Sequence, residues 1–305
     1  MRHIVRLLFA AALAWHAVAA GYIAPAAAQQ GRGQNHCAAA DVYWYNNGYG
    51  TLDEAHQEYI GYLICTLSRA GFLGAIDVLY AFATSDATVA LTNLATINYA
   101  QYGTPLLYNA VAYGSPTFTP DYGYAGVDGS TTVYIDSGLV ISGSTNCTAQ
   151  AVPNSLCGAF VWSSTNTTPT LGGVAVGSTT DSGCTSGIMA APSLADGHGW
   201  GSGMTTTQLD AGVNSATGPF NVLGLYSSGQ VTFIDINGTQ VASNILTQSA
   251  APSGSVSVLA CNANGSIKLG DGNQIAIVAV GFVSNSACSI FANYMYRVNG
   301  TAPPC

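Results

Sequence analysis

The 305-residue sequence is poor in charge, and above all in glutamate and in basic residues. Charged residues make up 7% of it, with 6 Lys and Arg against 14 Asp and Glu. Proteins bind phosphate backbones with clustered Lys and Arg, so this composition excludes a nucleic-acid-binding protein. The formal net charge of −8 also disfavours binding to anionic lipid surfaces.

The usual signatures of hydrolases are missing as well. A glucanase needs two facing carboxylates, one to donate a proton and one to attack or to activate water. Glu54 and Glu58 are the two glutamates of the chain, and no Asp-x-Asp pair lies on a predicted strand. There is no G-x-S-x-G elbow, and no histidine follows His198. We therefore expect a non-catalytic protein, and keep polysaccharide hydrolysis through Asp196 or His198 as an alternative.

Long apolar runs are absent beyond the N-terminus. There, "MRHIVR" supplies positive charge, "LLFAAALAW" is apolar, and three alanines precede Gln29, which is typical of a signal peptide over residues 1–28. No segment reaches the about 20 apolar residues that a membrane span needs. We expect a secreted or periplasmic protein without a membrane span, the alternative being an uncleaved anchor. Removal of residues 1–28 leaves four basic residues against fourteen acidic ones, a formal charge of −10.

Cysteine usage agrees with export. An even number of cysteines in an oxidising compartment predicts disulfides, whereas the absence of C-x-x-C spacing argues against a zinc site. The eight candidates are Cys37, Cys65, Cys147, Cys157, Cys184, Cys261, Cys288 and Cys305. We predict the local pair Cys147–Cys157. Cys288 and Cys305 have two open alternatives, a bond to each other or bonds to the body of the domain.

Helices are predicted near both ends of the chain. Residues 29–50 lack periodicity and are expected to be flexible. Over residues 51–71 apolar residues recur at helical spacing, Thr51 and Glu54 form a capping-box pattern, and Gly71 stands where a helix would end. A short C-terminal helix is predicted within 284–298, followed by a tail at 299–305.

Between the helices the pattern is that of an all-β domain, over residues 72–298. Short β-rich runs alternate with Gly, Ser, Asn and Pro, and "NVLGLYSSGQVTFIDINGTQVASNI" predicts two successive hairpins, the second with a tight Asn237-Gly238 turn. Many strands at this spacing predict a mostly β, antiparallel β-sandwich. The predicted strands are 115–119, 131–136, 159–165, 172–177, 220–227, 230–236, 256–261 and 274–282.

Three stretches of the sequence resemble a known protein family. "IDVLYAFATSDATVALTNLA", "YNAVAYGSPTFTPDYGYAGVDGSTTVYIDSGL" and the closing "NYMYRV" together resemble a concanavalin A-like, laminin-G-like jelly-roll domain of largely uncharacterised bacterial and phage-associated proteins. The resemblance implies a jelly roll of two packed antiparallel sheets, in a superfamily that includes lectins, glycan-binding modules and glucanases. It also implies a calcium site as an option. Fold likeness by itself does not define activity.

The candidate ligand-binding site is "DGHGWGSGM", residues 196–204. We interpret it as a glycine-rich loop between strands, in which Trp200 offers a stacking surface and Asp196 and His198 are polar neighbours. For calcium, oxygen ligands in glycine-rich loops are the candidates, each of which has a plainer role as a turn residue. Those candidates are Asp128, Asp196, Asp271 and Asn273.

Together these observations predict an exported protein that binds carbohydrate or another extracellular surface. Two alternatives stay open at this stage. One is a structural or assembly protein, such as a virion fibre or a cell-surface component, and the other is the polysaccharide hydrolase. A homo-oligomer is compatible with each of them.

Overall fold

The computed structural model describes residues 37–48, 51–95, 108–143, 156–165, 173–192, 196, 198–213, 218–226, 230–247, 249–281, 283, 285–301 and 305. The predicted signal peptide lies outside them. The α-helices are α2 (Ala38–Asn47), α3 (Glu54–Arg69), α4 (Ala87–Ala90) and α5 (Cys288–Asn299). The strands are β1 (Ile76–Ala81), β2 (Val111–Tyr113), β3 (Thr117–Thr119), β4 (Gly123–Ala125), β5 (Tyr134–Val140), β6 (Leu156–Ser163), β7 (Val176–Thr179), β8 (Gly187–Ala191), β9 (Trp200–Thr205), β10 (Leu209–Asp210), β11 (Gly218–Tyr226), β12 (Gln230–Ile236), β13 (Thr239–Leu246), β14 (Ser255–Val258), β15 (Cys261–Ala263), β16 (Ser266–Lys268) and β17 (Gln274–Gly281).

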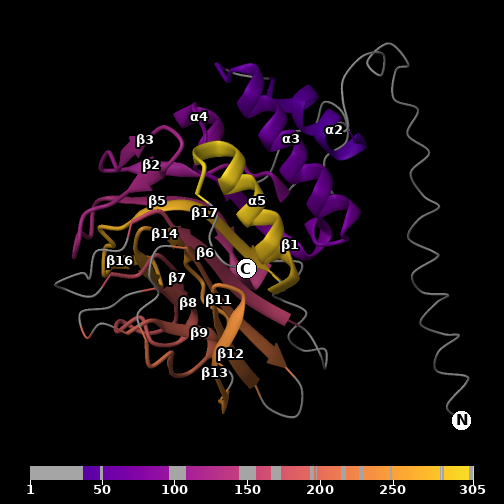
Figure 1. Ribbon diagram of the computed structural model, residues 1–305. Coiled ribbons are helices and arrows are strands. Elements are labelled where there is room, and N and C mark those ends of the chain that lie inside the picture. Colours follow the sequence, from indigo (N-terminus) through magenta and orange to yellow (C-terminus); the bar gives the residue numbers. More distant parts are fainter. Residues whose placement is uncertain are drawn as a thin grey trace, which may run out of the picture.

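The strands form two sheets that pack face to face, as the sequence predicts. The eight-stranded sheet has the order β13-β12-β11-β6-β17-β4-β3, with β1 also paired to β17. The nine-stranded sheet has the order β10-β9-β8-β7-β14-β5-β2, with the β15–β16 hairpin joined to β7. All pairs are antiparallel except β15 with β7. Figure 1 shows the two sheets, with the helices gathered on one side of the molecule.

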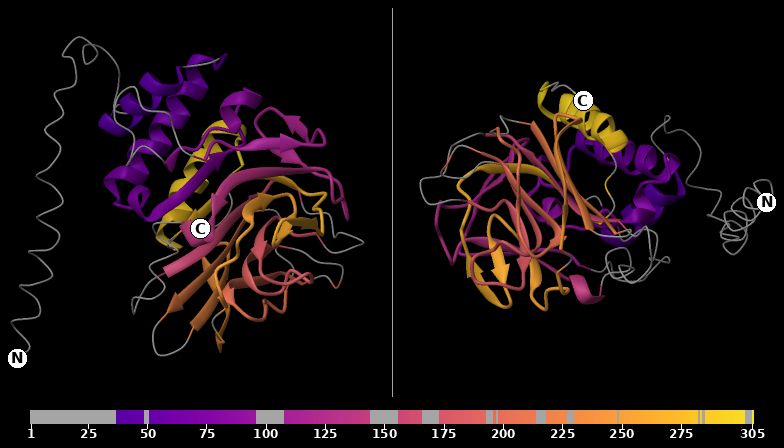
Figure 2. Two further views of the ribbon diagram at one scale, coloured as in Figure 1. Left: turned by 180° about the vertical axis from the view of Figure 1, so that it is seen from behind. Right: turned by 90° about the horizontal axis from the view of Figure 1, so that it is seen from below.

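Three apolar clusters mark the layers. The first lies between the sheets, where Val161 of β6 and Val278 of β17 share one cluster with Val176 of β7 and Val258 of β14. The second lies between the helices and the other face of the eight-stranded sheet, where the rings of Phe160 and Phe291 approach to 4.6 Å. Both faces of that sheet are therefore buried at β1 and β17, whereas β13 at its edge is mostly exposed. Figure 2 shows the helices on one side of the sheet in two views.

The third cluster is small and lies on the outer face of the nine-stranded sheet. Its buried members are Val174, Cys184, Met189, Ala191, Cys261 and Ala263, and Trp200 and Leu269 pack against them partly exposed. This outer face has no helix among the described residues. Strands β7 and β8 are nevertheless buried along their whole length, so other parts of the chain cover the middle of this face.

The helix predicted over 51–71 is α3, but its cap differs from the prediction. Asp53 is the N-cap and accepts the backbone N–H of His56 at 2.9 Å. Thr51 cannot cap because its backbone N–H and its hydroxyl both bond to the Asp86 carboxylate. At the other end Gly71 has a φ of +76°, the left-handed conformation predicted for it.

An imidazole joins α3 to the edge of the sandwich. The buried His56 ring has Nδ1 2.8 Å from Asp53 Oδ2 and Nε2 2.7 Å from Oδ1 of Asp121, which lies between β3 and β4. The hydrogen bonds from His56 hold the pKa of Asp53 below its usual value. Asn299, the last residue of α5, donates to the Asp121 carbonyl at 3.1 Å. The two helices thus meet the sheet edge at one point.

The expectation of a flexible segment at 29–50 is wrong for residues 38–47, which form α2. The sequence of this helix has no amphipathic pattern. It is held instead by the Cys37–Cys65 disulfide to α3 and by burial of Tyr43 and Trp44. Residues 29–36 lie outside the described ranges.

The Asn237-Gly238 turn is confirmed, and each predicted strand overlaps an observed one. Two of them differ in extent: 172–177 shares only residues 176 and 177 with β7, and 256–261 is interrupted by a bend at residues 259–260 that separates β14 from β15. Asn237 and Gly238 both have positive φ, of 53° and 74°, and connect the paired residues Ile236 and Thr239 as a two-residue hairpin turn. The C-terminal helix is also confirmed, as α5.

Among the described cysteines, the disulfides are Cys37–Cys65, Cys184–Cys261 and Cys288–Cys305. Cys157 is disulfide-bonded, whereas Cys147, its predicted partner, lies outside the described residues.

The interpretation of residues 196–204 as a loop is wrong for residues 200–204, which belong to β9. Its glycines serve close packing rather than flexibility. A Cβ at Gly201 would lie 2.4 Å from Val222 Cγ2, and one at Gly203 would lie 2.6 Å from the backbone nitrogen of Gly224. Val222 and Gly224 belong to β11, so glycines on β9 are what lets the two sheets approach here. Within the described ranges, no helix is long and apolar enough to cross a membrane.

We expect Gly203→Ala to lower the free energy of unfolding by about 1–3 kcal/mol, because the new methyl group would clash with backbone atoms, which no second substitution can remove. Gly201→Ala meets a side chain, and combining it with Val222→Ala should cost less than the two single changes added together. Urea unfolding followed by far-UV circular dichroism measures both. Strict additivity of the Gly201 and Val222 changes would contradict the packing described for β9.

Candidate functional site

The structure brings the three predicted ligand-binding residues together. Asp196 is exposed and accepts two hydrogen bonds, from the backbone N–H of His198 at 2.9 Å and from the indole Nε1 of Trp200 at 2.9 Å. Each bond uses a different carboxylate oxygen. The indole plane is therefore fixed by a carboxylate on one side and by the third cluster beneath it.

A fourth residue, Asp210, completes this group and was not predicted. Oδ2 of Asp210 lies 3.1 Å from His198 Nδ1, and Oδ1 accepts the Gly212 N–H at 2.7 Å. The side chains of His198 and Asp210 keep 41% and 38% of their surface exposed. Asp210 pairs with Trp200 across the β9–β10 ladder, a relation that only strand register reveals. We call Asp196, His198, Trp200 and Asp210 the tryptophan station.

The remaining polar residue of the stretch, Ser202, is not part of this surface. It is fully buried, and its hydroxyl donates to the Gly187 carbonyl at 2.8 Å and lies 3.0 Å from the Thr205 hydroxyl. Glu54 and Glu58 are exposed on α3, among the helices. The station thus offers an aromatic face with hydrogen-bonding groups, and no serine hydroxyl among the described residues bonds to its histidine.

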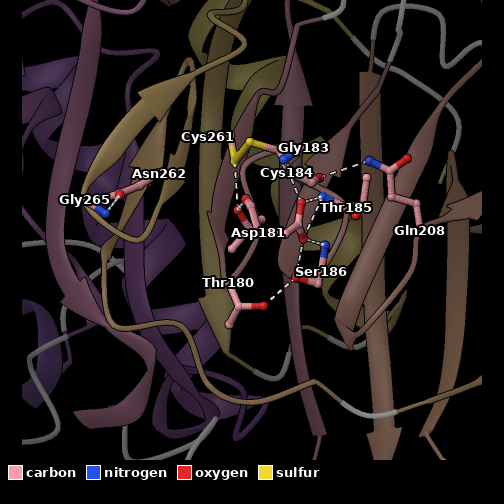
Figure 3. Close-up of a disulfide and its surroundings, with 11 residues drawn as sticks. Thr180, Asp181, Gly183, Cys184, Thr185, Ser186, Gln208, Cys261, Asn262 and Gly265 are labelled. Carbon is pink, nitrogen blue, oxygen red and sulfur yellow. Dashed lines mark hydrogen bonds between the residues drawn. A yellow bond between two sulfur atoms is a disulfide. The ribbon is translucent and has the colours of Figure 1, made fainter.

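A rigid loop supports the third cluster, and with it Trp200. Figure 3 shows Asp181 turned inward beside the Cys184–Cys261 disulfide, surrounded by donors from residues 183–186. Its carboxylate accepts the N–H groups of Gly183 at 2.8 Å, Thr185 at 3.1 Å and Ser186 at 2.7 Å, and the Ser186 hydroxyl. Burial alone would raise the pKa of Asp181, but these bonds outweigh it and hold the pKa below its usual value.

The predicted calcium ligands Asp128, Asp271 and Asn273 also lie together, apart from Asp196. Asp271 is fully buried, and its Oδ1 accepts both the backbone N–H and the side-chain amide of Asn273 at 2.9 Å. Its Oδ2 is buried with no hydrogen-bond partner among the described residues. Burial, and then the nearby Asp128 charge, raise the pKa of Asp271 to about 6.

Glycines let backbone close around this aspartate. A Cβ at Gly173 would lie 2.8 Å from Asp271 Oδ1, and one at Gly126 would lie 2.4 Å from the Asp271 carbonyl oxygen. No group of three or more His, Cys, Asp or Glu suited to a metal ion occurs among the described residues. The donors at this place are thus two carboxylates and amide or carbonyl oxygens, a set that fits a hard cation such as calcium and does not fit zinc.

Sequence reasoning also missed an exposed aromatic pair. Tyr113 of β2 and Tyr134 of β5 stack with ring centroids 4.8 Å apart and planes 13° from parallel. Tyr43 and Trp44, near the N-terminus, are by contrast buried in α2. The sequence could have indicated Tyr134, because it precedes the buried Ile135 in a predicted strand and therefore lies on the opposite face of that strand.

No family model matches the sequence, and the search of curated proteins finds no match. Among solved structures, the chain is similar to domain 4 of AbnA, an extracellular arabinanase from Geobacillus stearothermophilus in complex with arabinotriose, at 16% identity and a TM-score of 0.38, covering 70% of this chain and 96% of that one. It is similar to the CBM40 of Ruminococcus gnavus IT-sialidase bound to α2,3 sialyllactose, at 13% identity and a TM-score of 0.34, covering 54% and 94%. It is also similar to a structure of botulinum neurotoxin type C, a toxin whose cell entry depends on interaction with two ganglioside molecules. The identity is 10% and the TM-score 0.47, and the match covers 74% of this chain and 53% of that one. At these TM-scores the similarities carry no argument about function.

We expect Asp181→Ala to lower the free energy of unfolding by about 1–2 kcal/mol at neutral pH, because several donors lose their acceptor in a partly exposed loop. The pKa of Asp181 is lowered in the folded state, so its stabilisation is present above the ordinary aspartate pKa and is lost as pH falls through the folded value. Chemical denaturation at pH 7 and at pH 3 measures this. Glu58→Ala, which removes the same charge from an exposed site, is the control, and equal losses at both pH values would contradict the assignment.

Proposed function

We propose that this protein binds neutral carbohydrate outside the cell, without catalysis, through the tryptophan station. The observation that carries the proposal is the indole of Trp200, partly exposed, backed by the third cluster and fixed by its hydrogen bond to Asp196. An aromatic face that is held in one orientation stacks against a sugar ring without first losing rotamer freedom.

The polar groups around Trp200 suit sugar hydroxyls. The carboxylates of Asp196 and Asp210 accept hydrogen bonds, and the His198 ring is held between Asp210 and solvent. Shape and a few convergent polar groups are what small-ligand sites require. Three of the four station residues were predicted from the sequence, and their hydrogen bonding to one another supports a preformed site.

Charge defines the class of sugar. The chain has a formal net charge of −8, and the station itself carries two carboxylates. Sialylated, sulfated or uronic-acid-rich glycans would be repelled, so we assign neutral glycans as the ligands. The disulfides and the predicted leader support an exported, lectin-like protein of the concanavalin A-like, laminin-G-like type.

The loops with Asp128, Asp271 and Asn273 are proposed to hold a calcium ion with a structural role. The supporting observation is Asp271, a fully buried aspartate whose Oδ2 lacks a hydrogen-bond partner among the described residues. A bound cation would compensate a charge that burial otherwise penalises.

The Trp200→Ala variant should bind glycan at least about tenfold more weakly than the wild type while unfolding at nearly the same denaturant concentration. Isothermal titration with neutral cello-, xylo- and arabino-oligosaccharides, and with 3′-sialyllactose as the anionic probe, measures this. Trp200→Phe should retain part of the affinity. Tyr296→Ala, at an exposed tyrosine of α5, is the matched control. If the wild type gives only background signal on a neutral-glycan array, with and without calcium, the proposal is wrong. A stable homo-oligomer detected by light scattering would then favour the structural or assembly protein.

Calcium should raise the melting temperature of the wild-type protein, and Asp271→Asn should remove that rise. With calcium at about 100 times its Kd the stabilisation amounts to about 2.7 kcal/mol. Differential scanning calorimetry with EDTA, calcium or magnesium measures the effect, and Glu58→Gln is the control for loss of a charge. A wild-type melting temperature that does not respond to calcium would refute the site without touching the glycan proposal.

A further inference from the structure

The tryptophan station uses its side-chain hydrogen-bond donors internally. The indole Nε1–H of Trp200 and the backbone N–H of His198 both donate to the Asp196 carboxylate, each at 2.9 Å. His198 Nδ1 lies 3.1 Å from Asp210 Oδ2. Because an ionised carboxylate can only accept, Nδ1 carries the proton of this contact. In the neutral ring the other nitrogen, Nε2, is then an acceptor.

The backbone N–H groups beside the station are used as well. Asp210 Oδ1 accepts the Gly212 N–H at 2.7 Å. The Gly199 N–H donates to the Val213 carbonyl at 2.8 Å, and the Gly199 carbonyl accepts the Ala211 N–H at 2.9 Å. What the station presents to a ligand is therefore a set of acceptors.

Both carboxylates keep capacity to accept further hydrogen bonds. A carboxylate has about four lone-pair sites, and Asp196 and Asp210 each accept two hydrogen bonds within the station. Asp196 is exposed, and the Asp210 side chain keeps 38% of its surface exposed. The segment 196–213 contains no Lys or Arg that would neutralise these two acids. A ligand thus meets two carboxylates with open acceptor sites.

The two carboxylates flank the indole. Asp196 bonds to its Nε1 edge, whereas Asp210 is the direct partner of Trp200 in the β9–β10 ladder. Direct partners in a ladder point to the same face of the sheet, with Cβ atoms about 5 Å apart. β10 is the edge strand of the nine-stranded sheet, so this arrangement lies at the edge and does not depend on the covered strands β7 and β8.

This combination of groups suits a positively charged donor. An ammonium group has three N–H donors and no acceptor, which matches a site that offers acceptors and negative charge. A cation beside a tryptophan ring is stabilised further by the negative face of the ring. A sugar hydroxyl uses the same acceptors without the charge, and a carbonyl or a carboxylate would meet acceptors instead of donors. The charge that disfavours anionic glycans thus favours cationic ones.

We infer that the tryptophan station selects sugars that carry a free amino group, and binds their ammonium form between Asp196 and Asp210 beside Trp200 more tightly than the neutral sugar with the same ring. This rests on the proposed function and adds to it the chemical group by which one sugar is preferred to another. Asp210, which bonds to His198 through one oxygen, is then a residue that determines specificity.

The test compares three disaccharides that share one ring and one linkage. Cellobiose carries a hydroxyl at carbon 2, the β1,4-linked glucosamine disaccharide carries an ammonium there, and its N,N′-diacetyl form carries an amide. Titration calorimetry at about pH 6.5, where most of the sugar amine is protonated, should give the amino disaccharide about three- to tenfold higher affinity than cellobiose. The diacetyl form should show no gain. In about 1 M NaCl the gain should shrink, because partly exposed ion pairs are screened.

Variants without one charge assign the gain to the station. Asp210→Asn and Asp196→Asn keep an acceptor oxygen and the size of the side chain, and each should lower the ratio of the two affinities to about twofold or less. Glu58→Gln removes one negative charge from the helical layer and is the matched control, whose ratio should equal that of the wild type. Melting temperature identifies a variant that fails to fold, in which case the other asparagine variant carries the test.

Two results would overturn the inference and leave the proposed function standing. One is equal affinity of the wild type for the amino disaccharide and for cellobiose. The other is an unchanged ratio in the asparagine variants, or an equal fall of the ratio in Glu58→Gln, because the attraction would then come from the overall charge of the chain. If none of the three disaccharides binds, the inference is wrong as well, and the neutral-glycan array decides the proposed function separately.

A lysine side chain presents the same ammonium group as an amino sugar. Nα-acetyl-lysine methylamide is therefore titrated in parallel, and it should bind more weakly than the amino disaccharide because it has no sugar ring to stack on the indole. If it binds as tightly, the ring contributes nothing and the assignment to amino sugars is wrong. Trp200→Ala should weaken binding of both cellobiose and the amino disaccharide, which tests the proposed function independently of the amino group.

Discussion

The constraint on which this structure depends is that strands β1 and β17 of the eight-stranded sheet are buried on both faces. Along β17 every residue from Ile275 to Gly281 is buried, which alternation with solvent on one side would not allow. One face packs on the second sheet and the other needs a further layer. The helices supply that layer, although α2 and α3 come from one end of the chain and α5 from the other. The Cys37–Cys65 and Cys288–Cys305 disulfides and the His56 contacts hold these terminal segments where the sheet requires them.

This arrangement decides which surface is left for recognition. With the helices on the eight-stranded sheet, the outer side of the nine-stranded sheet carries only a small apolar cluster, and its partly exposed aromatic side chain is Trp200. The glycines of β9 bring that sheet close to β11, while the Cys184–Cys261 disulfide and the Asp181 loop fill the space behind Trp200. Of the side chains proposed to meet a glycan, Trp200 and Asp210 therefore stand on strands, whereas Asp196 and His198 lie in the segment before β9 and are held by their hydrogen bonds.

The sequence allowed the fold class, most of the named strands, the two terminal helices and the Asn237-Gly238 turn to be predicted, because period, turn residues and caps are local signals. The bend that divides 256–261 into β14 and β15 was missed, because its apolar residues read as one continuous strand. Helix α2 was missed because its stability comes from a disulfide and two buried aromatic side chains, not from an amphipathic pattern. β9 was taken for a loop because glycine normally marks loops, whereas here it permits contact with β11, a partner about 20 residues away in sequence. Of the candidate site, Asp196, His198 and Trp200 were close enough in sequence to be recognised together. Asp210 and the tyrosine pair depend on strand register, which composition and spacing do not encode.

The Cys37–Cys65 disulfide has a consequence for how the molecule is presented. It anchors residue 37 to α3 within the helical layer, and two sheets separate that layer from the face that carries Trp200 and Tyr113. Residue 37 therefore lies on the helical side of the molecule, which Figure 1 shows. The domain is thus polarised between an attachment side and a recognition side. A label or a bead coupled to an exposed residue of the helical layer, such as Glu58, would leave Trp200 facing away from the point of attachment.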